Sequence, residues 1–189
     1  MKNVILGVLT LVLIATGCKS KSEEQEPMKV AEQHTIQVQG HRGERGNLPE
    51  NSIEAFLGAL RKGVDVLELD VVISKDKKVV VSHEPYMLAL YMQTPTGDSI
   101  AKETEKEYNL YEMDYAEIKQ FTVAVTIKSE NLKPVKFNIE IKSEEAVYGM
   151  YQPGPDEFVD LVMQVVQDKK AEDQINMQSF DIRILEAMH

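Results

Sequence analysis

Apolar residues recur at two alternating spacings between residues 36 and 189. In residues 51–62 and 156–169 they lie three and four positions apart, which is the spacing of an amphipathic helix. Shorter helices are predicted for residues 114–121 and from residue 182 onward. Short apolar or alternating runs predict strands, and these occupy residues 36–41, 64–73, 78–83, 136–142 and 174–180. Strands that alternate with helices favour an α/β fold built on a parallel sheet.

The helix at residues 51–62 has suitable residues at both ends. Asn51 is predicted as its N-cap, with Glu54 three residues later, and Gly63 stands where a glycine commonly ends a helix.

Two of the predicted strands carry charge on one face. Successive side chains of a strand point to opposite sides, so Glu68 and Asp70 share a face, as do Glu140 and Lys142. Buried carboxylates are costly unless they are paired or bind metal. Three carboxylates from two strands therefore predict a site for a hard divalent cation, Mg²⁺ or Ca²⁺. The alternative is a solvent-exposed sheet face with surface charges, because charged residues are mostly exposed.

Two histidines end predicted strands, His41 in GHRG and His83 in VVVSHE. The carboxyl ends of parallel strands are where α/β barrels place catalytic residues. Histidines there can serve as general base and general acid near neutral pH. Arg42 offers a guanidinium suited to a phosphate, and Gly40 and Gly43 allow sharp turns beside it.

The amino-terminal segment resembles a bacterial lipoprotein signal. Residues 1–17 combine a basic start, an apolar stretch too short to span a bilayer, and small residues before Cys18. Cys18 is thus expected to be lipidated, and residues 18–33 to form a flexible polar tether. The protein would then be lipid-anchored to a bacterial membrane in the cell envelope. An ordinary signal peptide or a short anchor helix with an incidental cysteine is the alternative.

Composition narrows the possible partners. The chain has 189 residues, 43% of them hydrophobic, and a net charge of −10, which suits one globular domain. The acidic balance argues against non-specific nucleic-acid binding. A phosphate-bearing ligand would need local cations or a metal.

The motifs together resemble the glycerophosphodiester phosphodiesterase family. The similar run is GHRGERGNLPENSIEAFLGALRKGVDVLELDVVISKDKKVVVSHEPYM, from residue 40 to residue 87, followed by NIEIK at 138–142 and QSFD at 178–181. The resemblance spans residues 36–189. It implies a TIM-type (β/α)8 barrel at 34–189 that uses a divalent cation to hydrolyse glycerophosphodiesters to glycerol phosphate and an alcohol.

The resemblance also implies roles for individual residues. His41 and His83 would be the acid–base pair, Arg42 and Lys142 would hold the phosphate, and Glu50 would lie close by. The metal ligands would be Glu68, Asp70 and Glu140. Residues 86–112 would form the insertion that contacts the glycerol or alcohol moiety.

Three features depart from the family pattern. Glu84 follows His83 where the family usually has aspartate, and residues 122–135 lack a helical pattern. The sequence ends one helix after the fifth predicted strand, so about three strands of a barrel are absent. A catalytically inactive truncated lipoprotein or binding module is therefore an alternative. A phospholipase-D-like or cyclising phosphodiesterase is another, because similar residues serve that chemistry.

Overall fold

The computed structural model describes residues 36–120 and 135–189. The predicted signal peptide at 1–17, Cys18 and the tether at 18–33 lie outside these residues, and so does nearly all of the non-helical stretch at 122–135. None of the helices in the described part of the chain is long and apolar enough to cross a membrane.

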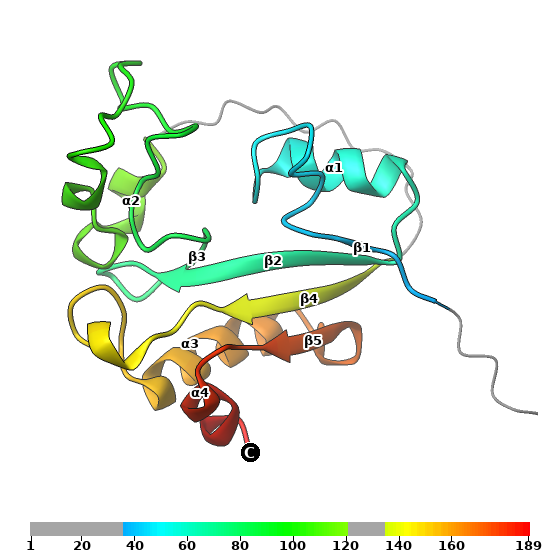
Figure 1. The fold of residues 1–189 in the computed structure, drawn as a ribbon. Coiled ribbons are helices and arrows are strands. Elements are labelled where there is room, and N and C mark those ends of the chain that lie inside the picture. Colours follow the sequence, from blue (N-terminus) through cyan, green and yellow to red (C-terminus); the bar gives the residue numbers. More distant parts are fainter. Residues whose placement is uncertain (1–35, 121–134) are drawn as a thin grey trace, which may run out of the picture. The chain divides into compact units, whose positions relative to one another are not determined.

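Four parallel strands form the centre of the fold, in the order β1-β2-β4-β5 (Figure 1). The strands are β1 (Gln39–Gly40), β2 (Val66–Ile73), β4 (Lys136–Ile141) and β5 (Ile175–Gln178). The predicted α/β class with a parallel sheet is confirmed. The first strand is shorter than expected, because residues 36–38 are not paired as a strand and Ile36 is 93% exposed.

The third strand corrects the sequence-based prediction. β3 (Val79–Val81) pairs with β2 in the antiparallel sense, Val81 opposite Val71. A parallel neighbour needs a crossover of a dozen or more residues, whereas only residues 74–78 join the two strands. Ser74 and Lys78 close this turn, in which the Ser74 amide donates to the Lys78 carbonyl over 2.9 Å.

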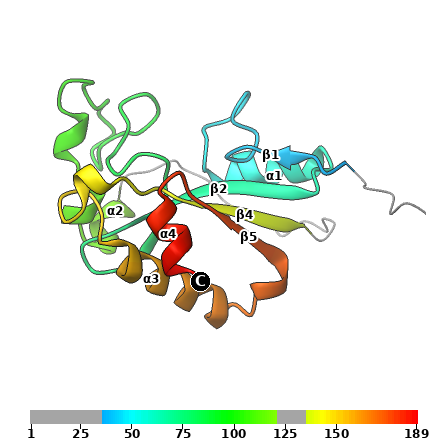
Figure 2. The same ribbon diagram turned by 60° about the horizontal axis from the view of Figure 1, so that its bottom comes forward.

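Helices cover the apolar face of the sheet. α3 (Pro155–Asp168) and α4 (Ile182–Ala187) pack on β2 and β4 (Figure 2). The cluster between them contains Val71, Ile73, Ile141, Phe158, Val159, Val162 and Ile184. α1 (Ile53–Arg61) packs beside Leu67, which lies on the same face of β2. The face predicted to be apolar from alternation is therefore the one that the helices bury.

The start of α1 differs from the prediction by one residue. Ser52 is the N-cap, since its hydroxyl accepts the Ala55 amide over 3.1 Å. Asn51 instead lies outside the helix with a φ of 54°, which frees its side chain for a contact elsewhere. Gly63 has a φ of 81° just after the helix, as predicted.

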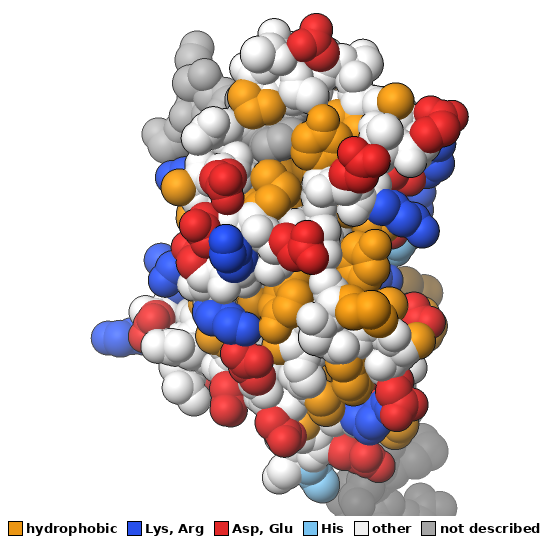
Figure 3. Space-filling model, turned by 90° about the vertical axis from the view of Figure 1, so that its left-hand side faces the viewer, with side chains coloured by type: hydrophobic (Ala, Val, Ile, Leu, Met, Phe, Trp, Pro, Cys, Tyr) orange, Lys and Arg blue, Asp and Glu red, His pale blue; other side chains and the backbone are white. Residues whose placement is uncertain are grey.

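The stretch at 86–112 packs on the opposite face of β2, near its carboxyl end. Its Met87, Ile100 and Leu110 form a cluster with Val72 of β2 and Ile118 of α2 (Tyr115–Ile118). Short 3-10 turns occur at Glu105–Glu107, Leu110–Glu112, Glu145–Val147 and Glu172–Gln174. Figure 3 views the molecule from the side on which the stretch at 86–112 lies, and it shows apolar side chains exposed among charged ones. By alternation, Val72 shares its face with Glu68 and Asp70, so the stretch adjoins the carboxylates.

Candidate active site

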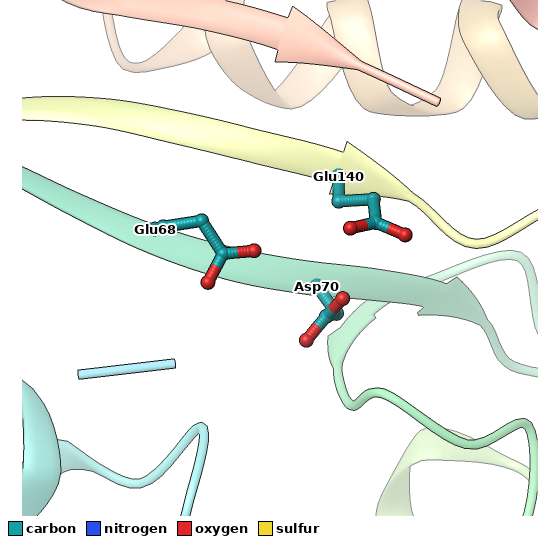
Figure 4. A group of neighbouring side chains, drawn as sticks. All are labelled: Glu68, Asp70 and Glu140. Carbon is teal, nitrogen blue, oxygen red and sulfur yellow. The ribbon is translucent and has the colours of Figure 1, made fainter. Parts of the chain in front are cut away.

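Three carboxylates converge on the face of β2 and β4 that lies opposite α3 and α4. β2 and β4 pair so that Asp70 lies beside Glu140, and Glu68 beside Asn138. One oxygen from each of Glu68, Asp70 and Glu140 lies within 4.8 Å of the others, and the three side chains point to the same side (Figure 4). The residues are 5%, 0% and 6% exposed, which rules out the alternative of surface charges.

The bonding of these carboxylates fits a bound cation. Glu68 Oε1 and Asp70 Oδ1 are buried without a hydrogen-bond partner. Burial raises the pKa of Glu68, and the neighbouring charges of Asp70 and Glu140 raise it further, although the Arg42 amide lowers it. Unsatisfied buried carboxylate oxygens are costly, and Mg²⁺ and Ca²⁺ take oxygen ligands of this kind. The three residues predicted as metal ligands are therefore suited to that purpose.

Two basic side chains balance part of the negative charge. Lys142, directly after β4, places its Nζ 2.6 Å from Glu140 Oε1 and 3.9 Å from Asp70 Oδ1. Arg42 Nε lies 3.2 Å from Asp70 Oδ2. Both residues predicted to hold phosphate thus lie beside the acidic cluster.

The loop after β1 brings His41 and Arg42 to the cluster. Gly43 has a φ of 79°, and its amide donates to the Gly40 carbonyl over 3.1 Å, so both glycines form the predicted sharp turn. A Cβ on Gly43 would lie 2.5 Å from the backbone carbon of Ala55 in α1. The turn directs the Arg42 amide to Glu68 Oε2 over 2.7 Å. His41 Nε2 lies 3.9 Å from the same oxygen.

Glu50 holds the guanidinium of Arg42 from the other side. Arg42 Nη1 donates to Glu50 Oε1 over 2.8 Å, and the Arg42 side chain is only 12% exposed. Arg45 and Tyr91 also contact Glu50, over 3.2 and 3.3 Å. The predicted proximity of Glu50 is confirmed, and Arg42 already joins two carboxylates.

The hairpin brings His83 back along β2 toward Asp70, because its strand runs in the unexpected direction. It follows β3 by two residues, and the preceding Ser82 amide donates to the Asp70 carbonyl over 3.0 Å. The prediction that His83 ends a parallel strand is wrong, because the hairpin returns the chain along β2. His83 Nδ1 lies 2.9 Å from Glu84 Oε1.

Two residues at the cluster were not predicted. Asn51 Nδ2 donates to Asp70 Oδ2 over 2.9 Å, and Gln178 Nε2 donates to Glu140 Oε2 over 3.0 Å. Asn138 in turn donates to Gln178 Oε1 over 2.8 Å. Both residues lie in motifs already noted, PEN and QSFD, which were the available signals.

Comparison with known proteins decides the family. The sequence profile of the glycerophosphoryl diester phosphodiesterase family matches residues 41–189. The chain belongs to this family. A curated glycerophosphodiester phosphodiesterase of Caldanaerobacter subterraneus subsp. tengcongensis is 29% identical over 152 residues, which cover 76% of this chain and 58% of that protein.

Solved structures of the phosphodiesterase family share the fold. One from Silicibacter pomeroyi DSS-3, described as a predicted glycerophosphoryl diester phosphodiesterase, matches with a TM-score of 0.67 and 26% identity, over 81% of this chain and 60% of that chain. An Oleispira antarctica phosphodiesterase in complex with the product sn-glycerol-3-phosphate matches with a TM-score of 0.56 and 21% identity, over 80% and 60%. This chain therefore spans about 60% of the length of these relatives.

Proposed function

We propose that this protein hydrolyses glycerophosphodiesters to glycerol phosphate and an alcohol, with the help of a divalent cation. The observation that carries the proposal is the buried cluster of three carboxylates, two of whose oxygens lack a hydrogen-bond partner. Membership of the family supports it. So do His41, whose Nε2 lies 3.9 Å from Glu68 Oε2, and His83, which follows the strand that returns along β2.

The cation would be held by Glu68, Asp70 and Glu140. Mg²⁺ or Ca²⁺ at such carboxylates polarises phosphoryl oxygens and offsets the charge that develops on them. Because the site keeps Arg42 and Lys142 beside the carboxylates, these two side chains would also attract and orient the phosphate.

Each of the two histidines carries out one of the two proton transfers of the hydrolysis. His41 Nε2 takes a proton from the attacking water as its oxygen bonds to phosphorus. The bond between phosphorus and the alcohol oxygen then breaks, and that oxygen receives the proton from His83 Nε2. His41 faces the cluster through Nε2 and is more than half exposed, which suits the partner of an incoming water.

The glycerol phosphate half of the substrate has support from a relative. The Oleispira antarctica phosphodiesterase binds sn-glycerol-3-phosphate as product, and this chain has the corresponding fold. The stretch at 86–112, which adjoins the carboxylate face, would contact the alcohol.

The proposal is tested by assaying the full chain on glycerophosphocholine with Ca²⁺ or Mg²⁺. We expect turnover that EDTA removes, and a fall in kcat of about 10²–10⁴-fold in His41→Asn and in His83→Asn, the usual range for a positioned acid or base. His189→Ala is the matched control, because His189 is exposed. A wild-type chain that binds the cation but gives no hydrolysis would overturn the proposal, and near-normal turnover in either variant would remove that histidine's role.

The cellular location is proposed from the sequence alone. Lipidation at Cys18 would anchor the enzyme to a bacterial membrane, with residues 18–33 as the tether.

A further inference from the structure

The ring of His83 has a carboxylate on its inner nitrogen. His83 Nδ1 and Glu84 Oε1 are 2.9 Å apart, and the two side chains are 24% and 29% exposed. Glu84 is not among the metal-cluster residues or the acid–base pair. The ring nitrogen that carries the proton in a neutral histidine is set by the hydrogen bond that the other nitrogen makes.

Neighbouring residues contact both the backbone carbonyl and the side chain of Glu84. The Ser82 hydroxyl donates to the Glu84 backbone carbonyl over 2.7 Å. The Tyr86 hydroxyl lies close enough to the Glu84 carboxylate to lower the pKa of Glu84 and to have its own pKa raised by it. The bond from His83 lowers the pKa of Glu84 despite partial burial, and burial raises the pKa of Tyr86 to about 12. At neutral pH the carboxylate is therefore ionised and the phenol keeps its proton.

The residue before the pair is hydrogen-bonded to β2 at a member of the acidic cluster, because the Ser82 amide donates to the Asp70 carbonyl over 3.0 Å. Lys142, which contacts Glu140 and Asp70, also attracts Glu84.

We infer that Glu84 is a positioning residue for His83, which holds the ring with Nδ1–H donated to the carboxylate and Nε2 free to face the substrate. The inference rests on the proposed function, in which His83 protonates the leaving alcohol.

The proton balance follows from this arrangement. The protonated ring gives its Nε2 proton to the alcohol oxygen as the bond to phosphorus breaks. The Nδ1 proton stays in the bond to Glu84, so the neutral ring is left in a single tautomer. Nε2 can then be protonated again from water for the next turnover.

Nitrogen NMR tests the tautomer without any need for activity. The full chain is labelled with ¹⁵N-histidine, and the His83 signals are identified by their loss in His83→Asn. In the wild type at a pH where the ring is neutral, we expect Nδ1 to carry the proton. In Glu84→Ala we expect the proton to shift toward Nε2. Glu107→Ala, which changes an exposed residue of the stretch at 86–112, should leave the signals unchanged.

A second variant keeps the test decisive if Glu84→Ala does not fold. In Glu84→Gln the Tyr86 hydroxyl should hold the amide oxygen, which turns the amide NH₂ toward His83. Nδ1 then accepts a bond, and the ring should adopt the Nε2–H tautomer. An unchanged Nδ1–H tautomer in the folded variants, or an Nε2–H tautomer in the wild type, would overturn the inference.

Kinetics with two leaving groups supply an independent readout. For glycerophosphocholine, kcat in Glu84→Ala should fall about 10–100-fold, as when the partner that orients a metal-bound histidine is removed, with KM unchanged. A p-nitrophenyl phosphodiester releases p-nitrophenolate, which leaves without protonation by a general acid. The kcat of Glu84→Ala on this substrate should therefore change far less. Equal losses on both substrates would overturn the inference. A wild type inactive on both would refute the proposed function, while the NMR result would still decide the role of Glu84.

Discussion

Replacing Glu68 by Gln tests the acidic cluster without relying on catalysis. The change keeps the size of the side chain and an oxygen that can accept the Arg42 amide. It removes one of three buried negative charges. We expect the variant to be more stable than the wild type in EDTA and to lose the stabilisation that a divalent cation gives the wild type.

The magnitude follows from the distances. Two like charges within 4.8 Å of each other repel by about 3 kcal/mol at an effective dielectric constant of ~20. Arg42 and Lys142 offset much of this, so we expect a net gain of about 1 kcal/mol, or roughly 2–4 °C in Tm for a domain of this size. A cation at 100 times its Kd stabilises the wild type by about 2.7 kcal/mol, or roughly 5–11 °C.

The pH dependence has a definite sign. Burial and like charges raise the pKa of Glu68 above its ordinary value of 4.5, so ionisation of this residue destabilises the fold. In EDTA, the wild type should lose stability as pH rises from about 4.5 through the raised pKa. Glu68→Gln should lack that loss.

The assay is thermal unfolding of the full chain across pH, with EDTA and with saturating Mg²⁺ or Ca²⁺. The order of the two melting temperatures should reverse between the conditions, with the variant higher in EDTA and the wild type higher with cation. Glu107→Gln, an exposed carboxylate, controls for the loss of one charge. An equal cation-induced shift in wild type and Glu68→Gln would refute the cluster as the binding site.

Three further changes probe the turn, the β5 end and the anchor. Gly43→Ala should lower the free energy of unfolding by at least about 2 kcal/mol in denaturant titration. The new Cβ would lie 2.5 Å from the backbone carbon of Ala55, and the φ of residue 43 is 79°. Gly46→Ala is the control, because its Cβ would enter open space and should leave the free energy of unfolding nearly unchanged. Burial raises the pKa of Asp181, but hydrogen bonds from its neighbours outweigh this and hold it at about 2. Asp181→Asn should therefore remove about 1–2 kcal/mol of stability at neutral pH, and the difference from wild type should disappear in acid unfolding as pH falls from about 4 to 2. Cys18→Ser should move the protein from the detergent phase to the aqueous phase in phase partitioning, and an unchanged distribution would argue against lipidation.

Local periodicity was sufficient to predict the faces of the strands. Side chains alternate strictly along an extended chain, so Glu68 and Asp70 must share one side of β2, with Val71 and Ile73 on the other. The helix pattern likewise located α1 and α3 to within two residues. These features depend on neighbours in sequence, which is why the sequence alone predicted them.

The pairing of β2 with β4, which brings the carboxylates together, was decided only by the tertiary structure. The register that places Asp70 beside Glu140 joins segments about seventy positions apart, and no local pattern specifies it. The same holds for Gln178, whose contact with Glu140 requires β5 to pair with β4.

The direction of β3 was set by the length of its connection. The short turn at 74–78 forces an antiparallel hairpin, and the length of this turn is a signal that the sequence itself contains. Asn51 needed the packed structure as well, because Ser52 and Asn51 are both good N-caps. Only the contact between Asn51 and Asp70 decides which residue caps the helix and which one serves the site.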